Sequence, residues 1–413
     1  MSEMAEKYAE RMARLDAAIA LQKPDRIPFA PKVSLFYCTG YDVSAYDVMK
    51  DFRNAEHAVK AFIEEYDPDL SWAPSTYPID PLEALQPDML RWPGPTHGLS
   101  LNSSYQHLDR TYMEDDEFNE FLHDPTHFII TKLLPRKYKH LRGLEKIRLH
   151  QIYDMSLIMG LSAFSDSDVI SALMTLAHAG RHVMEKKQQA AYIQNVIEKT
   201  CQCPIRGTAL CAPFDIYADS LRGLVQSVMD VEMYPEETLA CVERIAELCI
   251  DRDVEEARGR GEKFIFIPLH AGVDEFMSPK NYERFYWPTL KRLIIAITNA
   301  GMVPCVFCEG KYNTRLDVIS DVPKGKVYYM FEQIADMKRV KDIVGKTACI
   351  GGNIPTATLA FGTPEQVIDK TRELIDICAP GGGFMMDCSI IIDNAKHENM
   401  RAWKDATLKY GGY

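Results

Sequence analysis

The chain has 413 residues, of which 46% are hydrophobic and 26% charged, a composition typical of globular proteins and sufficient for one large domain. Its formal net charge of -12, with 59 acidic and 47 basic residues and no long basic run, argues against nucleic acid as a partner. The 11 cysteines are an odd number scattered along the chain, so we expect reduced thiols in a cytoplasmic protein instead of the bridges of a secreted domain.

The N-terminal stretch 1–21 carries mixed charge at helical spacing and predicts an amphipathic helix without the apolar run of a secretory signal. Residues 20–150 contain a dense scatter of proline and tyrosine, which indicates loops and short strands. We therefore predict that 1–150 is a helix- and loop-rich elaboration packed on the rest of the chain. The most apolar windows, such as 293–307, are too short and too interrupted to span a membrane.

Residues 151–413 alternate brief β-rich apolar runs with longer helical patterns. Strands are predicted at 263–269, 303–308, 327–331, 348–350 and 383–387. Helices are predicted at 165–200 in two stretches, 219–233, 235–260, 278–300, 333–344, 364–378 and 395–410. A strand that is followed by a crossover helix and another strand implies parallel pairing. We therefore expect an α/β protein whose residues 151–413 form the main part of a (β/α)8 TIM barrel. This barrel and the N-terminal elaboration should form one compact unit. A doubly wound open sheet is the alternative, since a sequence cannot show closure.

In a parallel barrel the reactive groups lie just after the strands, at their carboxyl ends. The residues at four such positions are His270 with Asp274, Cys308 with Glu309, Gly351 with Gly352 and Asn353, and Asp387 with Cys388. We expect these four positions to converge on one mouth. His270, Glu309 and Asp274 are the predicted catalytic residues. Imidazole, thiolate and carboxylate together suit Zn²⁺, so the predicted metal ligands are Cys308, Cys388, His270 and Glu309.

Each of these residues also has a structural interpretation. His270 and Glu309 could be polar groups anchored by hydrogen bonds at a strand end. Cys308 and Cys388 could be ordinary buried cysteines, and Asp274 and Asp387 could cap turns. Cys305 faces opposite to Cys308 on the predicted strand, so we interpret it as a core residue despite the CxxC spacing.

Two glycine runs differ in their context. The run 381–383 precedes a strand and predicts a turn, whereas a phosphate-binding loop would follow one. Gly352 and Asn353 do follow a strand, where glycine allows the backbone to approach a ligand, so they are predicted to bind substrate. Aromatic residues are frequent at 66–92 and 311–331. Most should simply pack, and Tyr312 is included as a predicted contact for a flat ligand.

Four blocks of sequence carry a resemblance to a known family. They are RLDAAIALQKPDRIPFAP at 14–31, APFDIYADSLRGLVQSVMD at 212–230, FMSPKNYERFYWPTLKRLI at 276–294, and GGGFMMDCSIII at 381–392 followed by AKHENMRA. Together they resemble the uroporphyrinogen decarboxylase superfamily over nearly the whole chain. The founding decarboxylases have an arginine-rich block soon after the opening, whereas the stretch KVSLFYCTGYD at 32–42 supplies no arginine here.

The resemblance therefore favours the methyltransferase branch of that superfamily, which moves a methyl group to or from a corrinoid on a partner protein. That branch holds zinc with a His-x-Cys motif and a later cysteine. Cys308 and Cys388 match the two cysteines, but Val306 occupies the place of the histidine. The resemblance then implies that His270 or Glu309 replaces the missing ligand.

The implied function is a corrinoid-dependent transfer of methyl between a small ether, amine or thiol and a cobalamin delivered by a partner corrinoid protein, with zinc as Lewis acid. The alternative is a decarboxylase of a uroporphyrinogen-like or other acid. A non-catalytic binding protein is the third hypothesis, because a fold alone does not define a function. No nucleic acid or membrane partner is expected, and a homodimer is a possible assembly.

Overall fold

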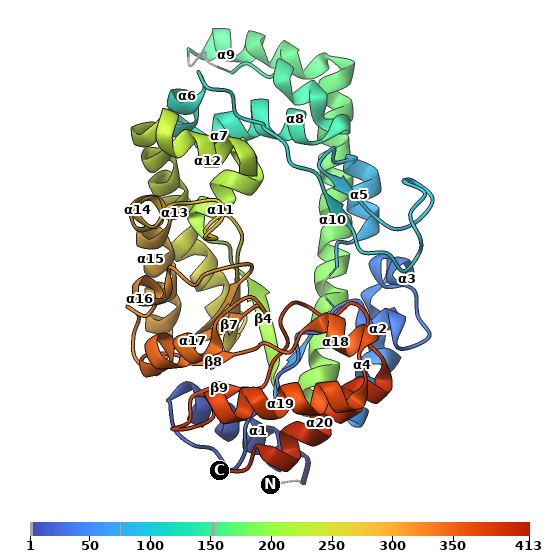
Figure 1. The fold of residues 1–413 in the computed structure, drawn as a ribbon. Helices are drawn as coiled ribbons and strands as arrows, with labels where there is room; N and C mark the ends of the chain where they lie inside the picture. The colour runs from blue at the N-terminus through green and yellow to red at the C-terminus, as the bar shows by residue number, and fades with distance from the viewer. Residues whose placement is uncertain (1–2, 75, 150–152) are drawn as a thin grey trace.

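The computed structural model describes residues 3–74, 76–149 and 153–413. Seven parallel strands lie side by side in one sheet in the order β1 (Ser71–Trp72), β4 (Ile205–Ala209), β5 (Phe264–Leu269), β6 (Val303–Cys308), β7 (Tyr328–Phe331), β8 (Cys349–Gly351) and β9 (Phe384–Met385) (Figure 1). A separate antiparallel pair consists of β2 (Leu90–Arg91) and β3 (Gln106–His107). Strands β5 to β9 confirm the five strands predicted from the sequence, with ends that differ by a few residues.

A short extended segment at residues 28–30 closes the sheet. The amide of Ala30 donates to the carbonyl of Met386, and the amide of Met386 donates to the carbonyl of Pro28, both at 2.9 Å. On the other side, the amide of Asp69 donates to the carbonyl of Phe29 at 2.8 Å just before β1. The segment thus lies between β9 and β1 and takes the eighth position of the predicted (β/α)8 barrel, which confirms the fold class.

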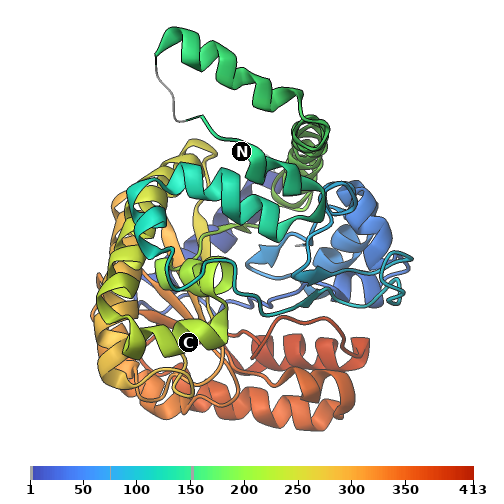
Figure 2. The same ribbon diagram turned by 90° about the horizontal axis from the view of Figure 1, so that it is seen from above.

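Helices form a ring around the strands (Figure 2). The helices of the second half are α11 (Pro213–Tyr217), α12 (Leu224–Met233), α13 (Pro235–Gly259), α14 (Pro279–Asn281), α15 (Trp287–Asn299), α16 (Leu316–Ile319), α17 (Met337–Ile343), α18 (Thr356–Phe361), α19 (Pro364–Cys378) and α20 (His397–Tyr410). Those of the first half are α1 (Glu3–Ile19), α2 (Phe36–Thr39), α3 (Ala45–Lys50), α4 (Glu56–Tyr66), α5 (Ile79–Leu85), α6 (Phe118–His123), α7 (Pro125–Phe128) and α8 (Leu134–Lys137). The longer predicted helices are confirmed.

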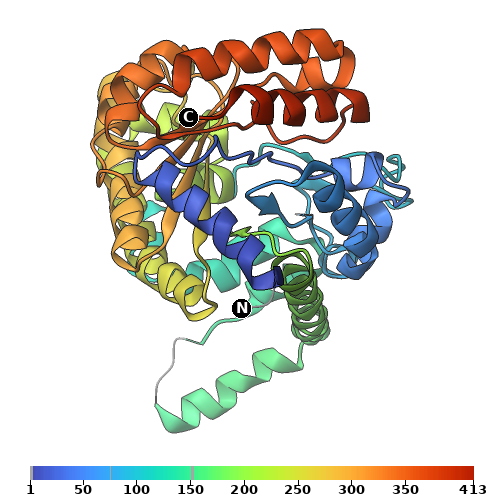
Figure 3. The same cartoon turned by 90° about the horizontal axis from the view of Figure 1, so that it is seen from below.

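The first half of the chain contributes to the barrel as well as to its surroundings. Helix α1 lies across the lower end of the strands (Figure 3), and its Leu15, Ala18 and Ile19 belong to the same apolar cluster as the side chains inside the barrel. The segment 28–30 and β1 are themselves barrel positions. The structure therefore differs from the predicted division at residue 150, because barrel strands occur on both sides of it.

Two helices extend away from the barrel. Helix α9 (Asp154–Gly160) has no buried residue, and α10 (Ser167–Asn195) is one long helix where the sequence predicted two stretches (Figures 1 and 2). Within the described ranges, no single helix is long and apolar enough to cross a membrane, and only the sharply bent pair 154–165 and 167–200 has that length and composition.

Alternate side chains of each strand belong to two separate apolar layers. The inner layer, which α1 covers from below, contains Trp72, Phe266, Cys305, Phe307, Tyr328 and Met385. The outer layer, between the strands and the helices, contains Ile265, Ile267, Val306, Cys308, Tyr329 and Met386. Since successive side chains of a strand point to opposite faces, the layer of each residue follows from its position.

Asp69 fastens the closing segment to the barrel. Its buried carboxylate accepts a hydrogen bond from the amide of Phe29 at 2.8 Å. The same carboxylate forms ion pairs with Arg14 of α1 and with Arg26, both at 2.6 Å. One side chain thus connects the helix at the lower end, the closing segment and β1.

We predict that Asp69→Ala lowers the free energy of unfolding by about 3–5 kcal/mol, because it leaves two arginines and a buried amide without their anion. Denaturant unfolding followed by circular dichroism measures this. The control is Asp25→Ala, since Asp25 pairs with the same Arg14 but is 64% exposed, and its loss should cost at most about 1 kcal/mol. Equal stability of the two variants would contradict the anchoring role of Asp69.

Candidate active site

A cavity of about 690 Å³ extends from the inner face of the barrel to α10 and reaches the carboxyl ends of β5 and β6. His270 and Glu309, which follow these two strands, both line it. Its other lining residues include Trp72, Tyr77, Tyr105, His107, Arg206, Phe266 and Pro268. The wall is therefore mixed, with several aromatic rings and a few charged groups, as is usual for sites that bind small organic molecules.

His270 lies between two carboxylates at the mouth of this cavity. Its Nδ1 is hydrogen-bonded to Oδ2 of Asp219 at 2.7 Å, and its Nε2 lies 3.6 Å from Oε2 of Glu309. Asp219 comes from the single π-helical turn Ala218–Arg222 that follows α11. The carboxylate on the Nδ1 side orients the imidazole, so that Nε2 lies on the side of Glu309.

The charges at the mouth change the pKa values of both groups. Burial lowers the pKa of His270, but the hydrogen bond to Asp219 and the charges of Asp215, Asp219 and Glu309 outweigh it and raise the value to about 9. Burial raises the pKa of Glu309 above its ordinary value, against the attraction of His270. His270 is therefore an imidazolium at neutral pH and is able to give up a proton from Nε2.

Asp215 supports His270 from below. Its buried carboxylate accepts hydrogen bonds from the amides of His270 and Ala271 at 3.2 and 2.9 Å and from the hydroxyl of Tyr286 at 2.7 Å. Burial raises the pKa of Asp215 to about 6, partly offset by the positive charge of His270. The carboxylate thus holds the backbone after β5 in the conformation that presents the imidazole to the cavity.

A second charged group lies among the side chains of the last strand and the closing segment. Lys32 is fully buried and pairs with Asp387 at 2.9 Å. The hydroxyl of Tyr328 donates to the same carboxylate at 3.0 Å, and the amide of Cys388 donates to it at 2.7 Å. Asp387 is therefore satisfied by its neighbours, in agreement with the structural interpretation of this residue.

The structure does not bring the four predicted zinc ligands together. Cys308 packs in the outer layer, where burial raises the pKa of its thiol well above the usual value. Cys388 is also buried there, with its sulfur 3.7 Å from the carbonyl oxygen of Lys32. His270 and Glu309 lie at the mouth instead. In the parts of the chain that the structure describes, no three His, Cys, Asp or Glu side chains form a group that could hold a metal ion.

The other predicted site residues have structural contacts away from the cavity lining. Asp274 accepts hydrogen bonds from the hydroxyl and the backbone amide of Thr314 at 2.7 and 3.2 Å, so its contacts are with a distant loop and not with its own turn. The side-chain amide of Asn353 donates to the carbonyl of Glu332 at 2.9 Å. Gly352 has a positive φ of 110°, and a Cβ there would lie 2.5 Å from the carbonyl oxygen of Phe331, so the close approach is to a neighbouring strand and not to a ligand. Tyr312 is buried in the outer layer.

Sequence reasoning missed three residues of the cavity and its mouth, namely Arg206, Asp215 and Asp219. Arg206 lies on β4, a strand of five residues with a glycine and a threonine that has no clear apolar pattern. Asp215 and Asp219 lie within the block 212–230. Their spacing of four residues places both on one face of a helical turn, and this was a usable signal.

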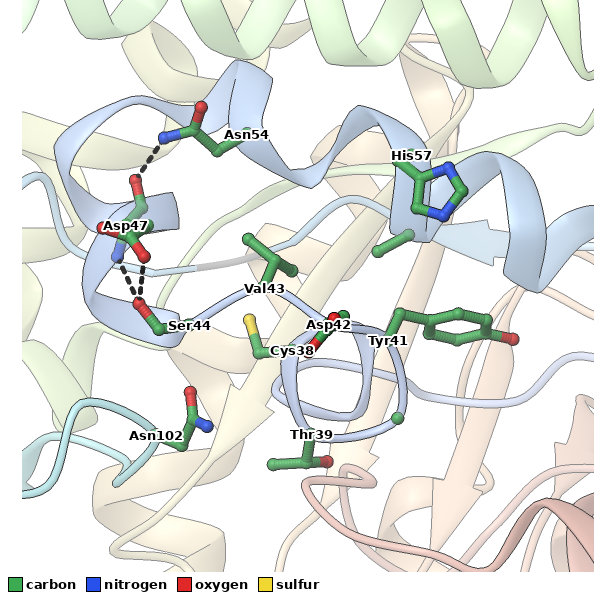
Figure 4. Close-up of a pocket in the computed structure, with 12 residues that line it drawn as sticks. Cys38, Thr39, Tyr41, Asp42, Val43, Ser44, Asp47, Asn54, His57 and Asn102 are labelled. Carbon is green, nitrogen blue, oxygen red and sulfur yellow. Dashed lines mark hydrogen bonds between the residues drawn. The ribbon is translucent and has the colours of Figure 1, made fainter.

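A second hollow of about 840 Å³ lies in the N-terminal part (Figure 4). It is lined by residues 38–44 together with Asp47, Asn54, His57, Ala58 and Asn102. This lining includes part of the stretch 32–42 that lacks arginine. Its charged members are acidic, Asp42 and Asp47, and neither arginine nor lysine occurs among the described lining residues. The hollow is thus unsuited to a ligand with many carboxylates.

The closed parallel barrel with a charged mouth defines an α/β-barrel protein, and comparison with known proteins identifies its family. The family model for uroporphyrinogen decarboxylase (URO-D) matches residues 182–410, more than half of the chain. The chain belongs to this family, which confirms the resemblance, and three of the four sequence blocks lie within the matched residues. No curated protein sequence matches the chain significantly.

Solved structures support the fold. A methyltransferase from Methanosarcina mazei is similar over 97% of this chain and 98% of that chain, with a TM-score of 0.64 and 15% identity. At this identity the likeness concerns the fold alone. A B12-independent methionine synthase from Shewanella sp. W3-18-1 is similar over 51% of this chain and 62% of that chain, with a TM-score of 0.37 and 17% identity, too low to carry an argument.

We predict that the imidazole of His270 titrates with a pKa of about 9 in NMR spectra of the folded protein. Asp219→Asn should lower this pKa by about one unit or more, because the hydrogen bond and one charge are lost. Since the folded value lies above the unfolded value of 6.5, the pair stabilises the fold fully below pH 6.5, and this stabilisation disappears as the pH rises through 9. Asp274→Asn is the control and should leave the titration unchanged. A wild-type pKa near 6.5 would refute the pairing.

Proposed function

We propose that this member of the URO-D family is a methyltransferase that exchanges a methyl group between a small methylated substrate in the barrel cavity and a cobalamin on a partner corrinoid protein. The observation that carries the proposal is the imidazolium of His270, held between Asp219 and Glu309 at the mouth of a cavity lined by several aromatic rings. The likeness in fold to a methyltransferase over nearly the whole of both chains supports it.

The residues at the mouth account for the proton that such a transfer requires. When a methyl group leaves an ether, amine or thiol, the bond from carbon to the heteroatom breaks and its electron pair remains on the heteroatom. Nε2 of His270 donates a proton to that atom, and Asp219 stabilises the imidazole in the required orientation. In the opposite direction the neutral imidazole accepts the proton from the attacking group.

The corrinoid, when present, supplies the acceptor or donor for the methyl group. We place its carrier over the mouth, where His270 is 38% exposed. Zinc stays a prediction of the family resemblance, and no step is assigned to it because the predicted ligands do not form one group. A cytoplasmic location and a homodimer also stay predictions.

The charges that line the cavity argue against decarboxylation of a tetrapyrrole with many carboxylates. Among the described lining residues, Arg206 is the single arginine or lysine, and the second hollow has none. A ligand with several buried carboxylates would leave most of them unpaired, at a cost of several kcal/mol each. A substrate with one anionic group is compatible with this lining.

The proposal predicts that the protein converts cob(I)alamin to methylcobalamin with at least one donor from the ether, amine and thiol classes. Absorption spectroscopy of the cobalamin measures this conversion. His270→Gln should lower kcat/KM by about 10²–10⁴-fold, because the proton donor is lost. The wild-type kcat/KM should fall as the pH rises through about 9, where the imidazolium loses its proton.

The matched control is His57→Gln, which changes a histidine of the second hollow and should leave the rate unchanged. Absence of methylcobalamin with all three donor classes would reject the methyltransferase. Release of carbon dioxide from a carboxylic acid, without methyl transfer, would favour the decarboxylase instead.

A further inference from the structure

Arg206 projects from β4 into the inner layer of the barrel and lines the cavity described above. It is only 7% exposed. The carbon of its guanidinium lies 3.2 Å from the ring centre of Trp72 and 4.0 Å from that of Phe266. The two aromatic rings therefore hold the planar cation in a fixed position.

The guanidinium has no anionic partner in the described structure. Its Nε and Nη1 atoms are buried and have no hydrogen-bond acceptor among the described residues. Of the carboxylates whose charges reach it, Asp387 is paired with Lys32 at 2.9 Å. The other, Glu262, accepts from Arg260 at 2.6 Å and from the amide of Thr208 at 2.7 Å.

Such a group is costly in a folded protein. Buried charges are almost always paired, and an unpaired one lowers the stability of the folded protein. Burial lowers the pKa of Arg206 to about 9, which reflects the same cost. An oxyanion bound in the cavity would supply the missing acceptors and would offset this cost only when the ligand is present.

We propose that Arg206 binds the carboxylate of a planar organic anion, and that this anion is the methylated substrate, an assignment that rests on the proposed function. Tyr77 and Tyr105 line the same cavity and offer faces for a flat ring, while Trp72 and Phe266 contact the guanidinium. The substrate class is thus an aromatic acid that carries its methyl group away from the carboxylate.

The strand register limits the length of this ligand. Phe266, whose ring contacts the guanidinium, precedes His270 by four residues along β5 and the turn after it, which is a rise of about 13 Å. A benzoate with a methoxy group on the opposite ring position spans about half of this distance between its carboxylate and its ether oxygen. The carboxylate would then lie at Arg206 and the methoxy oxygen would point toward His270.

The test uses two probes, 4-methoxybenzoate and its neutral analogue 4-methoxybenzamide, with binding to the whole protein measured by calorimetry in the absence of cobalamin. The wild type should bind the carboxylate at least about tenfold more tightly than the amide, because charge-assisted hydrogen bonds form only with the anion. Arg206→Met should abolish this preference and weaken carboxylate binding by about 10- to 100-fold.

Thermal unfolding of the ligand-free variants separates binding from a structural role. Arg206→Met removes an unpaired buried charge, so its melting temperature should equal or exceed that of the wild type. Arg206→Lys keeps the charge and should retain a weaker preference for the carboxylate. Arg260→Gln, which changes the arginine paired with Glu262, is the control and should bind both probes as the wild type does.

A wild type with no preference for the carboxylate, or an Arg206→Met protein that melts at lower temperature and keeps the preference, would overturn the proposal. The result is distinct from that of the methyl-transfer assay. Binding that depends on Arg206 without methyl transfer would retain the anion site and reject the methyltransferase. Methyl transfer from donors without an anionic group, at rates unaffected by Arg206→Met, would retain the methyltransferase and reject the anion site.

Discussion

The whole structure depends on the closure of a parallel sheet into a barrel, which buries most residues on both faces of its strands. Each side chain of a strand then points either to the helices or into the barrel, and the outer ones are excluded from the chemistry of the mouth. Asp69 maintains the closure at the segment 28–30. The candidate site consists of inner side chains, such as Arg206 and Phe266, and of residues just beyond the strand ends, such as His270 and Glu309.

This constraint also explains which predictions from the sequence succeeded. Apolar runs and helical periodicity located β5 to β9 and their helices, because these signals are local. The prediction that Cys305 and Cys308 face opposite sides of their strand is confirmed. The prediction that the thiol of Cys308 lies at the mouth is wrong, because this side chain packs between the strands and the helices. A strand that is buried on both faces has no polar side in its sequence to indicate which face is the inner one. His270 and Glu309 were found because they follow strands directly.

The groups with shifted pKa values have a common origin. Asp215 and Arg206 are both buried at a cost in stability, one with hydrogen bonds from the backbone after β5 and the other without a partner. Proteins retain such groups where binding or catalysis needs them. In this chain Arg206 lines the cavity, and Asp215 holds the backbone of His270, which lines the same cavity.

The most direct test of this account is a crystal structure of the protein soaked with 4-methoxybenzoate. The account predicts that the carboxylate contacts the guanidinium of Arg206, that the ring lies among the aromatic side chains of the cavity, and that the methoxy group faces His270. A ligand bound in the second hollow of Figure 4, or bound in the barrel with its carboxylate directed toward His270 and away from Arg206, would contradict it.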